Sequence, residues 1–364
     1  MGAAVAKPRY QGLVAARRWE HAPVAPRDDF SLAVGDRLGE LTVIGHLARG
    51  RLTELYQVWS NRHWCALTAK VVAAEHMKNG RLPTSLRKEE RVLHKIRHPN
   101  IVQVFGTGDA DGRHYLLMEY LAGPSLFDVL EQLPKRRLHV PDAVRAVMHV
   151  GAAIHYLHRC GWLYRDLKPG NVHLREGIPV LLDFDVVWPI GDEARRPGDR
   201  LGTAPYMAPE QVLREPLTPA TDVYGLGALL YELLTGRWST EEIEDDEDDD
   251  DWYDDDDEAD EEYAAAMTAL PPRSTGGSAR NLTTRELNSR YPQLANPAIP
   301  PRQRNPQIPV ELEKLVLRCL EYDPRKRFKT VSGMLAALAP MLKGRHRLWP
   351  ENAPVERRAD TVTR

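Results

Sequence analysis

The feature that most constrains the fold is a change of hydrophobic pattern near residue 140. Residues 41–121 contain several short apolar runs rich in Val, Leu and Tyr, which is typical of β-strands. One helical pattern interrupts them at 86–96. From residue 141 onward, apolar residues recur every three or four positions over longer segments. We therefore expect an α+β protein with a small, β-rich N-terminal lobe carrying one main helix and a larger, mostly helical C-terminal lobe.

The C-terminal part contains four segments with helical spacing. The first, 141–160, begins with Pro and Asp, a helix start signal, and the second, 220–236, is apolar on nearly all sides and is expected to be a buried central helix. Two further helices are predicted at 310–324 and 330–342, whereas 263–308 is expected to be mostly irregular. The predicted organisation is a leader (1–34), an N-lobe with hinge (35–121), a C-lobe (122–342) with an acidic, Pro-rich insert at about 238–308, and a tail (343–364).

The formal net charge of −3 conceals a strong segregation of charge. Residues 241–262 hold 18 acidic residues and no Lys or Arg, so removing them from a total of −3 leaves +15 on the rest of the chain. Such a run repels itself and lacks the apolar surface needed to fold, which predicts a solvated insert. Two interpretations remain: a tolerated loop insertion, or a regulatory segment that recruits basic substrates or covers the basic body as a salt-sensitive brake.

Nothing in the sequence indicates secretion, a membrane span or specific nucleic-acid binding. No apolar run approaches the length that crosses a bilayer, and the leader lacks the pattern of a signal peptide. No aromatic-basic stripe accompanies the positive charge, so solvated side chains explain it better than a nucleic-acid partner. The three cysteines lie far apart and match no metal-ligand spacing. We expect a cytoplasmic protein with buried thiols.

Two carboxylates interrupt the apolar run "VLLDFDVVW" (180–188), where an uncompensated charge would be costly. A hairpin formed by "VHLREGIPVLLDF" would bring Asn171 beside the first of them, Asp183. An Asn carbonyl and a carboxylate are oxygen ligands that Mg²⁺ uses together with substrate phosphates. We therefore predict that Asn171 and Asp183 hold Mg²⁺.

Three motifs, in their order and spacing, resemble those of the eukaryotic-like serine/threonine protein kinases. "YRDLKPGN" (164–171) resembles the catalytic loop, "DFD" (183–185) the DFG magnesium motif, and "GTAPYMAPE" (202–210) the segment ending in Ala-Pro-Glu. The resemblance covers about 39–342 and implies a two-lobe protein kinase fold with ATP and Mg²⁺ between the lobes. It also implies transfer of the ATP γ-phosphate to Ser or Thr hydroxyls of protein substrates. A P-loop NTPase is excluded because GxxxxGK[ST] is absent.

The resemblance assigns chemical roles by position. Asp166 would accept or orient the proton of the substrate hydroxyl, and Lys168 would stabilise the transferring phosphoryl group. Lys70, on the third strand of the small lobe, would bind the α- and β-phosphates, with Glu89 rather than Glu90 as its ion-pair partner. By itself Lys70 would be taken for a surface lysine; its place in the ordered set of motifs reverses that. The other ATP-binding candidates are the loop residues Ala48 and Gly50 and the gatekeeper and hinge residues Met118, Glu119 and Leu121.

A second set of positions resembles structural and regulatory residues. Glu210 and Arg327 correspond to the buried ion pair of the large lobe, and Asp222 to the aspartate that anchors the catalytic loop. Arg165 occupies the position that normally pairs with a phosphate on the activation segment, yet Thr203 is the only Ser or Thr in that segment. We therefore hypothesise that a carboxylate pairs with Arg165 permanently. The candidates are Asp192, Glu193 and Asp199.

Two departures from the family pattern leave an alternative function open. The three glycine positions of the nucleotide-binding loop read Ala48, Gly50 and Thr53, which predicts weaker ATP binding because side chains hinder the approach of phosphates. Asp185 replaces the glycine of DFG, either as a stiffened hinge or as an additional metal ligand. The alternative is a pseudokinase-like nucleotide-binding scaffold; the complete set of catalytic residues favours the enzyme.

Overall fold

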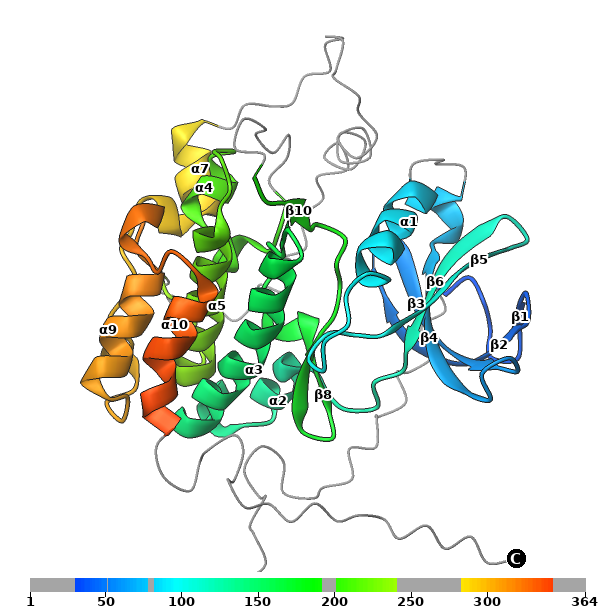
Figure 1. Cartoon of the computed structure of the whole chain (residues 1–364), viewed down its shortest axis with the longest axis horizontal. Coiled ribbons are helices and arrows are strands. Elements are labelled where there is room, and N and C mark those ends of the chain that lie inside the picture. The colour runs from blue at the N-terminus through cyan, green and yellow to red at the C-terminus, as the bar shows by residue number, and fades with distance from the viewer. Residues whose placement is uncertain (1–29, 51, 78–81, 192–200, 241–282, 343–364) are drawn as a thin grey trace, which may run out of the picture.

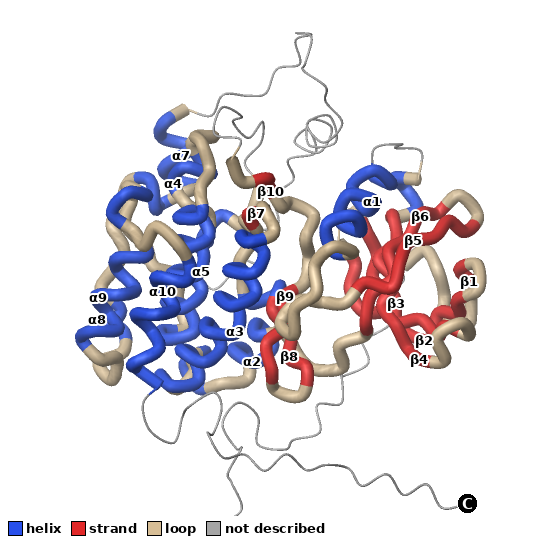
Figure 2. The backbone as a smooth tube through the Cα atoms, in the orientation of Figure 1, coloured by secondary structure: helices blue, strands red, loops and turns tan. Residues whose placement is uncertain are grey.

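The computed structural model describes residues 30–50, 52–77, 82–191, 201–240 and 283–342. These residues form a sheet-rich N-terminal lobe and a helical C-terminal lobe that lie side by side (Figures 1 and 2). The acidic run 241–262, the tail 343–364 and most of the predicted leader lie outside the described residues. The predicted α+β architecture with two lobes is confirmed.

The N-lobe is built on a six-stranded antiparallel sheet with strand order β1-β2-β3-β4-β6-β5. Its third strand shows the alternation that one buried face imposes, because Glu54, Tyr56, Val58 and Ser60 are buried and the residues between them are not. The strands are β1 (Arg37–Leu38), β2 (Leu41–Arg49), β3 (Thr53–Ser60), β4 (Cys65–Val72), β5 (Val104–Ala110) and β6 (Arg113–Glu119).

One helix, α1 (Leu82–Leu93), packs against this sheet next to β5 and β6 (Figure 1). Leu86, Val92 and Leu93 are buried on its inner side, as the helical spacing in this segment predicts. The helix thereby holds Glu89, which is also buried, beside Lys70 on β4, an interior strand of the sheet.

The C-lobe surrounds a central helix, α5 (Pro219–Thr235), which is buried along nearly its whole length and confirms the predicted buried helix. Thr218 caps its N-terminus, and Gly236, with φ of +75°, ends it in a left-handed turn. The other helices are α2 (Leu126–Glu131), α3 (Val140–Arg159), α4 (Pro209–Val212), α7 (Thr284–Arg290), α8 (Pro301–Arg304), α9 (Val310–Cys319) and α10 (Val331–Leu338).

The described part of 263–308 contains two short helices, α7 and α8, which the prediction of a mostly irregular segment did not include. These helices are short and only single residues of the segment are buried, so their sequences show no helical repeat of apolar residues. Tyr291, which follows α7, is buried against Met207 and Val212 of the C-lobe, with Leu287 packed beside it. Burial of these few side chains, rather than helical periodicity, supports the segment.

Two short antiparallel pairs lie where the lobes meet. Strands β8 (Val172–Arg175) and β9 (Ile178–Leu181) form the predicted hairpin, and β7 (Trp162–Leu163) pairs with β10 (Trp188–Pro189). One buried cluster runs through both lobes, from β6 to α3 and α5. The lobes are therefore joined by a continuous core. None of the helices in the described ranges combines the length and the hydropathy of a membrane span.

Candidate active site

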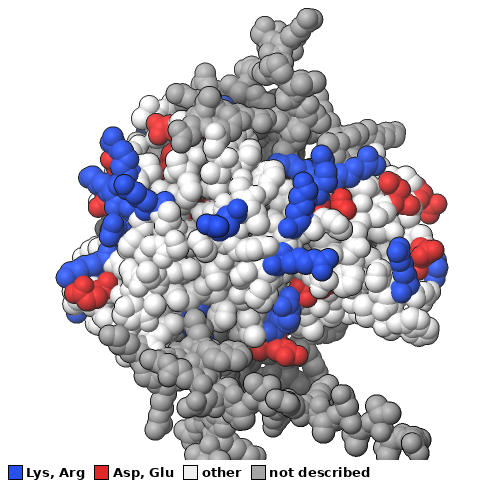
Figure 3. Space-filling view, viewed as in Figure 1, with Lys and Arg blue, Asp and Glu red and all other residues white. Residues whose placement is uncertain are grey.

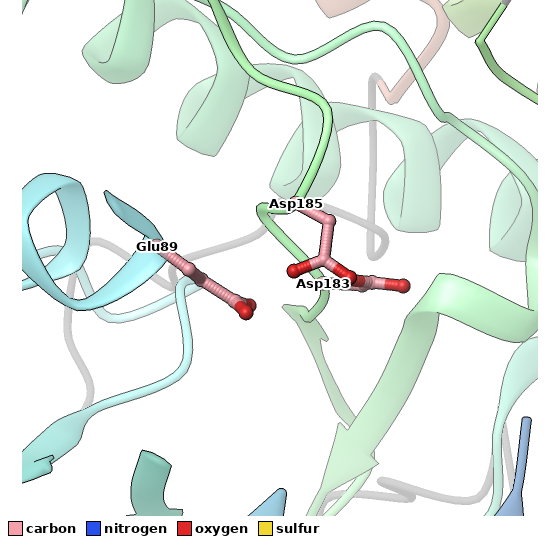
Figure 4. A group of neighbouring side chains, drawn as sticks. All are labelled: Glu89, Asp183 and Asp185. Carbon is pink, nitrogen blue, oxygen red and sulfur yellow. The ribbon is translucent and has the colours of Figure 1, made fainter. Parts of the chain in front are cut away.

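Lys70 lies at the centre of a group of three carboxylates between the lobes. It stands on β4, one strand later than expected because the two-residue β1 precedes the main strands. Its Nζ lies 3.0 Å from Glu89 Oε2, 3.0 Å from Asp183 Oδ1 and 2.7 Å from Asp185 Oδ2. Figure 4 shows Glu89 reaching from α1 toward the two aspartates, which come from the segment after β9.

The electrostatics of this group favour the charged lysine. Burial would lower the pKa of Lys70, but Asp183, Asp185 and Glu89 outweigh it and hold that pKa well above its ordinary value. Burial and the neighbouring Glu89 carboxylate raise the pKa of Asp185 to about 7, with Lys70 acting in the opposite direction. One carboxylate oxygen from each of Glu89, Asp183 and Asp185 lies within 4.8 Å of the other two, so Lys70 is surrounded by negatively charged groups.

Glu89 connects the sheet to the motif that follows β9. One of its carboxylate oxygens contacts Lys70, and the other accepts a hydrogen bond of 3.1 Å from the backbone N–H of Phe184. Phe184 is fully buried, and its ring meets the ring of Tyr164 edge to face at 5.3 Å. The hydroxyl of Tyr164 donates to the carbonyl of Leu182. Residues 182–184 are thus held on both sides.

Asp166 is surrounded by polar groups that fix its carboxylate. One oxygen accepts hydrogen bonds from the N–H and the hydroxyl of Thr203, at 3.0 and 2.9 Å. The other accepts from Nδ2 of Asn171 at 2.8 Å and lies 3.6 Å from Nζ of Lys168. The motifs at 164–171 and 202–210 therefore meet at one carboxylate, an arrangement suited to holding a substrate hydroxyl.

Asp222, at the start of α5, anchors the loop that carries Asp166. Its carboxylate accepts the backbone N–H groups of Tyr164 and Arg165, each at 2.8 Å, and His158 Nε2 lies 2.7 Å away. Arg165 has φ of +77°, a left-handed conformation that is costly for a side chain other than glycine. The buried Asp222 offsets that cost by accepting the N–H of Arg165 and the N–H of the residue before it.

Asn171 and Asp183 flank the open end of the β8–β9 hairpin, the first before β8 and the second after β9. The N–H of Leu182 donates to the carbonyl of Asn171 at 2.9 Å. This bond holds the backbone of Asn171 next to the residue that precedes Asp183. The amide nitrogen of Asn171 donates to Asp166, so its side-chain oxygen is the atom left to meet a cation. An amide oxygen and a carboxylate, 41% exposed in Asp183, form a donor set that fits a hard divalent cation.

Asp185 makes a contact that neither sequence interpretation included. Its carboxylate binds Lys70 rather than only stiffening a hinge or joining Asn171 and Asp183. A pattern of letters shows that a side chain replaces glycine at this position, but it does not show where that side chain points. In this motif, the left-handed backbone conformation is found at Asp183, whose φ is +55°.

The predicted nucleotide-binding loop is the turn between β2 and β3. Gly50 donates its N–H to the carbonyl of Thr53 at 2.9 Å, and Ala48 pairs with Leu55 in the sheet. A Cβ at Gly50 would meet the carbonyl oxygen of Thr53 at 3.5 Å, an ordinary contact. The turn itself therefore does not require glycine; its value would lie in the approach of a ligand from outside.

The predicted gatekeeper and hinge residues lie at the end of β6. Met118 and Leu121 are buried, and Met118 pairs with Thr68 of β4. The carboxylate of Glu119 binds Arg175 on β8 and accepts the N–H of Gln103 at 2.9 Å. Glu119 therefore also ties the end of the sheet to the C-lobe, a structural contact that its hinge position did not predict.

Glu210 and Arg327 form a fully buried ion pair in the C-lobe. The guanidinium nitrogens of Arg327 lie 2.7 and 2.9 Å from the two oxygens of Glu210, and Thr221 donates to the same carboxylate at 2.9 Å. Arg327 also donates to the carbonyls of Ala220 and Tyr322. The pair joins the Ala-Pro-Glu segment to the chain after α9.

Arg165 has described partners other than a phosphate. Its guanidinium lies 5.3 Å from the ring centre of Trp188, and Nη1 donates to the carbonyl of Val186 at 3.3 Å. Trp188 belongs to β10, which pairs with β7 directly before the catalytic loop. The carboxylates hypothesised as permanent partners, Asp192, Glu193 and Asp199, lie outside the described residues.

Comparison with known proteins gives one family. A family model described as the protein kinase domain matches residues 41–337. The probable serine/threonine-protein kinase PknB of Bifidobacterium longum is 25% identical over 321 residues, which is 85% of this chain and 40% of that protein. The serine/threonine-protein kinase PknH of Mycobacterium bovis is 29% identical over 205 residues, 56% of this chain and 34% of that protein.

A solved structure shows the same fold. The crystal structure of the kinase domain of PknI from Mycobacterium tuberculosis, in a mutant form, superposes with a TM-score of 0.57 at 19% identity. The match covers 85% of this chain and 98% of that one. The chain spans about two fifths of the length of the first curated relatives it matches, 40% and 43%.

Proposed function

The chain belongs to the protein kinase domain family, and on this premise we propose that it is a serine/threonine protein kinase. It transfers the γ-phosphoryl group of ATP to a Ser or Thr hydroxyl of a protein substrate, with Mg²⁺ as the divalent cation. The observation that supports this most directly is the carboxylate of Asp166, held by Thr203, Asn171 and Lys168. Degenerate scaffolds need no such arrangement around one carboxylate.

The residues divide the work of phosphoryl transfer. Asp166 receives the proton of the acceptor hydroxyl, and its fixed position orients that hydroxyl toward the phosphate. Lys168, 3.6 Å from Asp166, supplies positive charge at the transferring group. Lys70 binds the α- and β-phosphates in place of the two aspartates, Asp183 and Asp185, while its ion pair with Glu89 keeps the ammonium between the lobes. The catalytic effect comes from positioning and charge neutralisation.

The donor set of Asn171 and Asp183 would hold the cation. When bound there, Mg²⁺ would neutralise charge on the phosphates of ATP. The hairpin β8–β9 keeps both side chains at one edge, and the hydrogen bonds from Asn171 to Asp166 link the cation site to the acceptor site. A change at Asn171 therefore affects the geometry at Asp166 as well.

The second candidate function is a nucleotide-binding scaffold without transfer. It is favoured by the side chains at Ala48, Thr53 and Asp185, each of which replaces a glycine of the family pattern. The scaffold and the enzyme share ATP binding, so binding alone does not distinguish them. Transfer of phosphate does.

The test compares the full chain with D166N and with a control, D109N, whose aspartate is 59% exposed on β5. Each protein is incubated with radiolabelled ATP, Mg²⁺ and a panel of Ser- and Thr-containing proteins. We expect transfer by the native chain and by D109N, and a rate reduced by about 10²- to 10⁴-fold in D166N. Phosphoserine or phosphothreonine is then identified in the products. Equal transfer by native protein and D166N, or none by either, contradicts the proposed enzyme.

We further propose that the acidic run selects basic substrates. On the face shown in Figure 3, Lys and Arg side chains are spread over both lobes, so this face has little attraction for positively charged partners. The 18 acidic residues of 241–262 supply that attraction, and salt weakens it. Deletion of this run should raise KM for a basic substrate at low salt and leave KM for an acidic one unchanged. Equal KM values with and without the run contradict this proposal.

A further inference from the structure

Glu54 is a buried carboxylate with no part in the chemistry described above. It lies on β3 with no exposed surface, and its two oxygens accept hydrogen bonds from three side chains. Arg49 Nη1 lies 2.6 Å from Oε1, the hydroxyl of Tyr56 donates to Oε2 at 2.5 Å, and the hydroxyl of Ser31 donates to the same oxygen. Burial would raise the pKa of Glu54, but Ser31, Tyr56 and Arg49 outweigh it and lower that pKa, so the carboxylate is ionised.

The segment before the first strand is bound to the same place. The ring of Phe30 stacks on His46 of β2 with centroids 4.4 Å apart. The N–H of Leu32 donates to the Tyr56 hydroxyl at 3.1 Å, and its carbonyl lies 2.8 Å from His46 Nε2. These residues, 30–32, lie outside the region that matches the family model, 41–337. They are nevertheless packed on the N-lobe core as part of it.

Glu54 connects this segment to the turn that would cover a nucleotide. In the sheet, Arg49 pairs with Glu54 at the closing end of the β2–β3 hairpin, and the next pair is Ala48 with Leu55. Leu55 in turn pairs with Lys70 on β4. The ion pair of Arg49 and Glu54 therefore lies at the base of the turn, directly beside the strand pair that leads to the phosphate-binding lysine.

We propose that Glu54 and the segment Phe30–Leu32 form a clamp that positions the β2–β3 turn over the phosphates of ATP. The turn carries side chains at two of the three glycine positions, Ala48 and Thr53. These side chains hinder a close approach of its backbone N–H groups to phosphates. A defined placement of the whole hairpin offsets this hindrance. Glu54 is a positioning residue, acting through Arg49, and Ser31 acts through Glu54. The inference rests on the proposed ATP-dependent function.

The experiment measures ligand affinity by calorimetry with the full chain and its S31A and S31T variants. The ligands are a non-hydrolysable ATP analogue with Mg²⁺, and adenosine. S31A removes a hydroxyl that donates to Glu54 and accepts from Nη1 of Arg113, and its loss should weaken binding of the ATP analogue about fivefold, which corresponds to roughly 1 kcal/mol. Adenosine has no phosphates to be covered, so its affinity should stay the same. S31T keeps the hydroxyl and should restore the affinity for the ATP analogue.

A matched control is T42A, which removes the exposed hydrogen bond from Arg37 to Thr42 in the same sheet, 3.1 Å long. It should change neither affinity. If S31A binds the ATP analogue as tightly as the native chain, or loses affinity equally for adenosine, the clamp is wrong while the proposed function stands. If the native chain binds adenosine and the ATP analogue with the same affinity, the phosphates are not recognised and both proposals fail. E54Q, with its melting temperature measured in parallel, should reproduce the selective loss.

Discussion

The carboxylate of Asp185 lies 2.7 Å from Nζ of Lys70, nearer than either Glu89 or Asp183, which both lie at 3.0 Å. Asp185 stands where kinases of the resembled family have the glycine of DFG. The lysine that would bind phosphates is thus held by one more carboxylate than the family pattern supplies. Phosphates entering the site must compete with it and must also approach its negative charge.

The first prediction is that D185N binds ATP with Mg²⁺ about tenfold more tightly than the native chain. The amide keeps the size of the side chain but carries no negative charge, so its contact with Lys70 is weaker, and hydrogen bonds between charged groups contribute about 1.5–3 kcal/mol. The titration is run at pH 8, because the pKa of Asp185 is raised to about 7 and its carboxylate is ionised above that pH. D185G should show a similar gain and a more mobile segment. The measurement is calorimetric titration, with D109N as control. Weaker binding by D185N would instead identify Asp185 as a contributor to the cation site.

This contact marks a limit of prediction from the sequence. The two-lobe fold and the pairing of Lys70 with a carboxylate on the main N-lobe helix could be predicted, because motif order and spacing restrict them together. Where the Asp185 side chain points could not, since it depends on the backbone conformation of the segment that follows a hairpin. The sequence shows that an aspartate replaces a glycine at this position, but it does not show that this aspartate binds Lys70.

The second prediction concerns Trp188, whose ring lies 5.3 Å from the guanidinium of Arg165. We expect phosphatase-treated protein to remain active, because the Arg165 guanidinium already contacts the ring of Trp188 and the carbonyl of Val186. W188A should lower kcat about fivefold, as a cation–π contact contributes roughly 0.5–2 kcal/mol. The control is W64A, an exposed tryptophan at the β3–β4 turn, 79% exposed. A phosphatase-treated chain without activity would show that a phosphate is needed after all.

The third prediction is that R327M lowers the free energy of unfolding by about 3–5 kcal/mol. The change leaves the buried carboxylate of Glu210 without its arginine, and an uncompensated buried charge is costly. Urea denaturation measures the effect. R325A is the matched control, because Arg325 pairs with Asp323 at the surface and is 88% exposed. It should scarcely change the midpoint. If the urea midpoint of R327M equals that of the native chain, the ion pair of Glu210 and Arg327 adds little to stability.

The contacts of Ser31 and Trp188 were missed for a common reason. Residues 1–34 show no periodic pattern, and Trp188 follows the motif without belonging to it, so neither attracted a prediction. One signal was present: the alternation in β3 places Glu54 on the buried face together with Tyr56 and Val58. A charge at such a position requires partners from elsewhere in the chain. It does not say which segment provides them.

The last prediction is a loss of stability on mild acidification, centred on Asn100. The backbone N–H of Asn100 donates to Nδ1 of His98 at 3.1 Å, and its amide lies 3.2 Å from Nδ1 of His149. Both ring nitrogens serve as acceptors, so both imidazoles must be neutral. Burial lowers the pKa of His98, and burial together with Arg145 and His98 lowers that of His149.

The sign follows from proton counting. The unfolded histidines titrate near their ordinary pKa of about 6.5, whereas the folded ones take up protons only at lower pH. Between these two pKa values the unfolded chain binds more protons, so the free energy of unfolding falls as pH decreases below about 6.5 and is level above it. Urea midpoints at pH 7.5 and 5.5 measure this loss. In H149Q the loss should be smaller, because one of the two groups no longer titrates. An unchanged loss in H149Q would assign the effect to other groups.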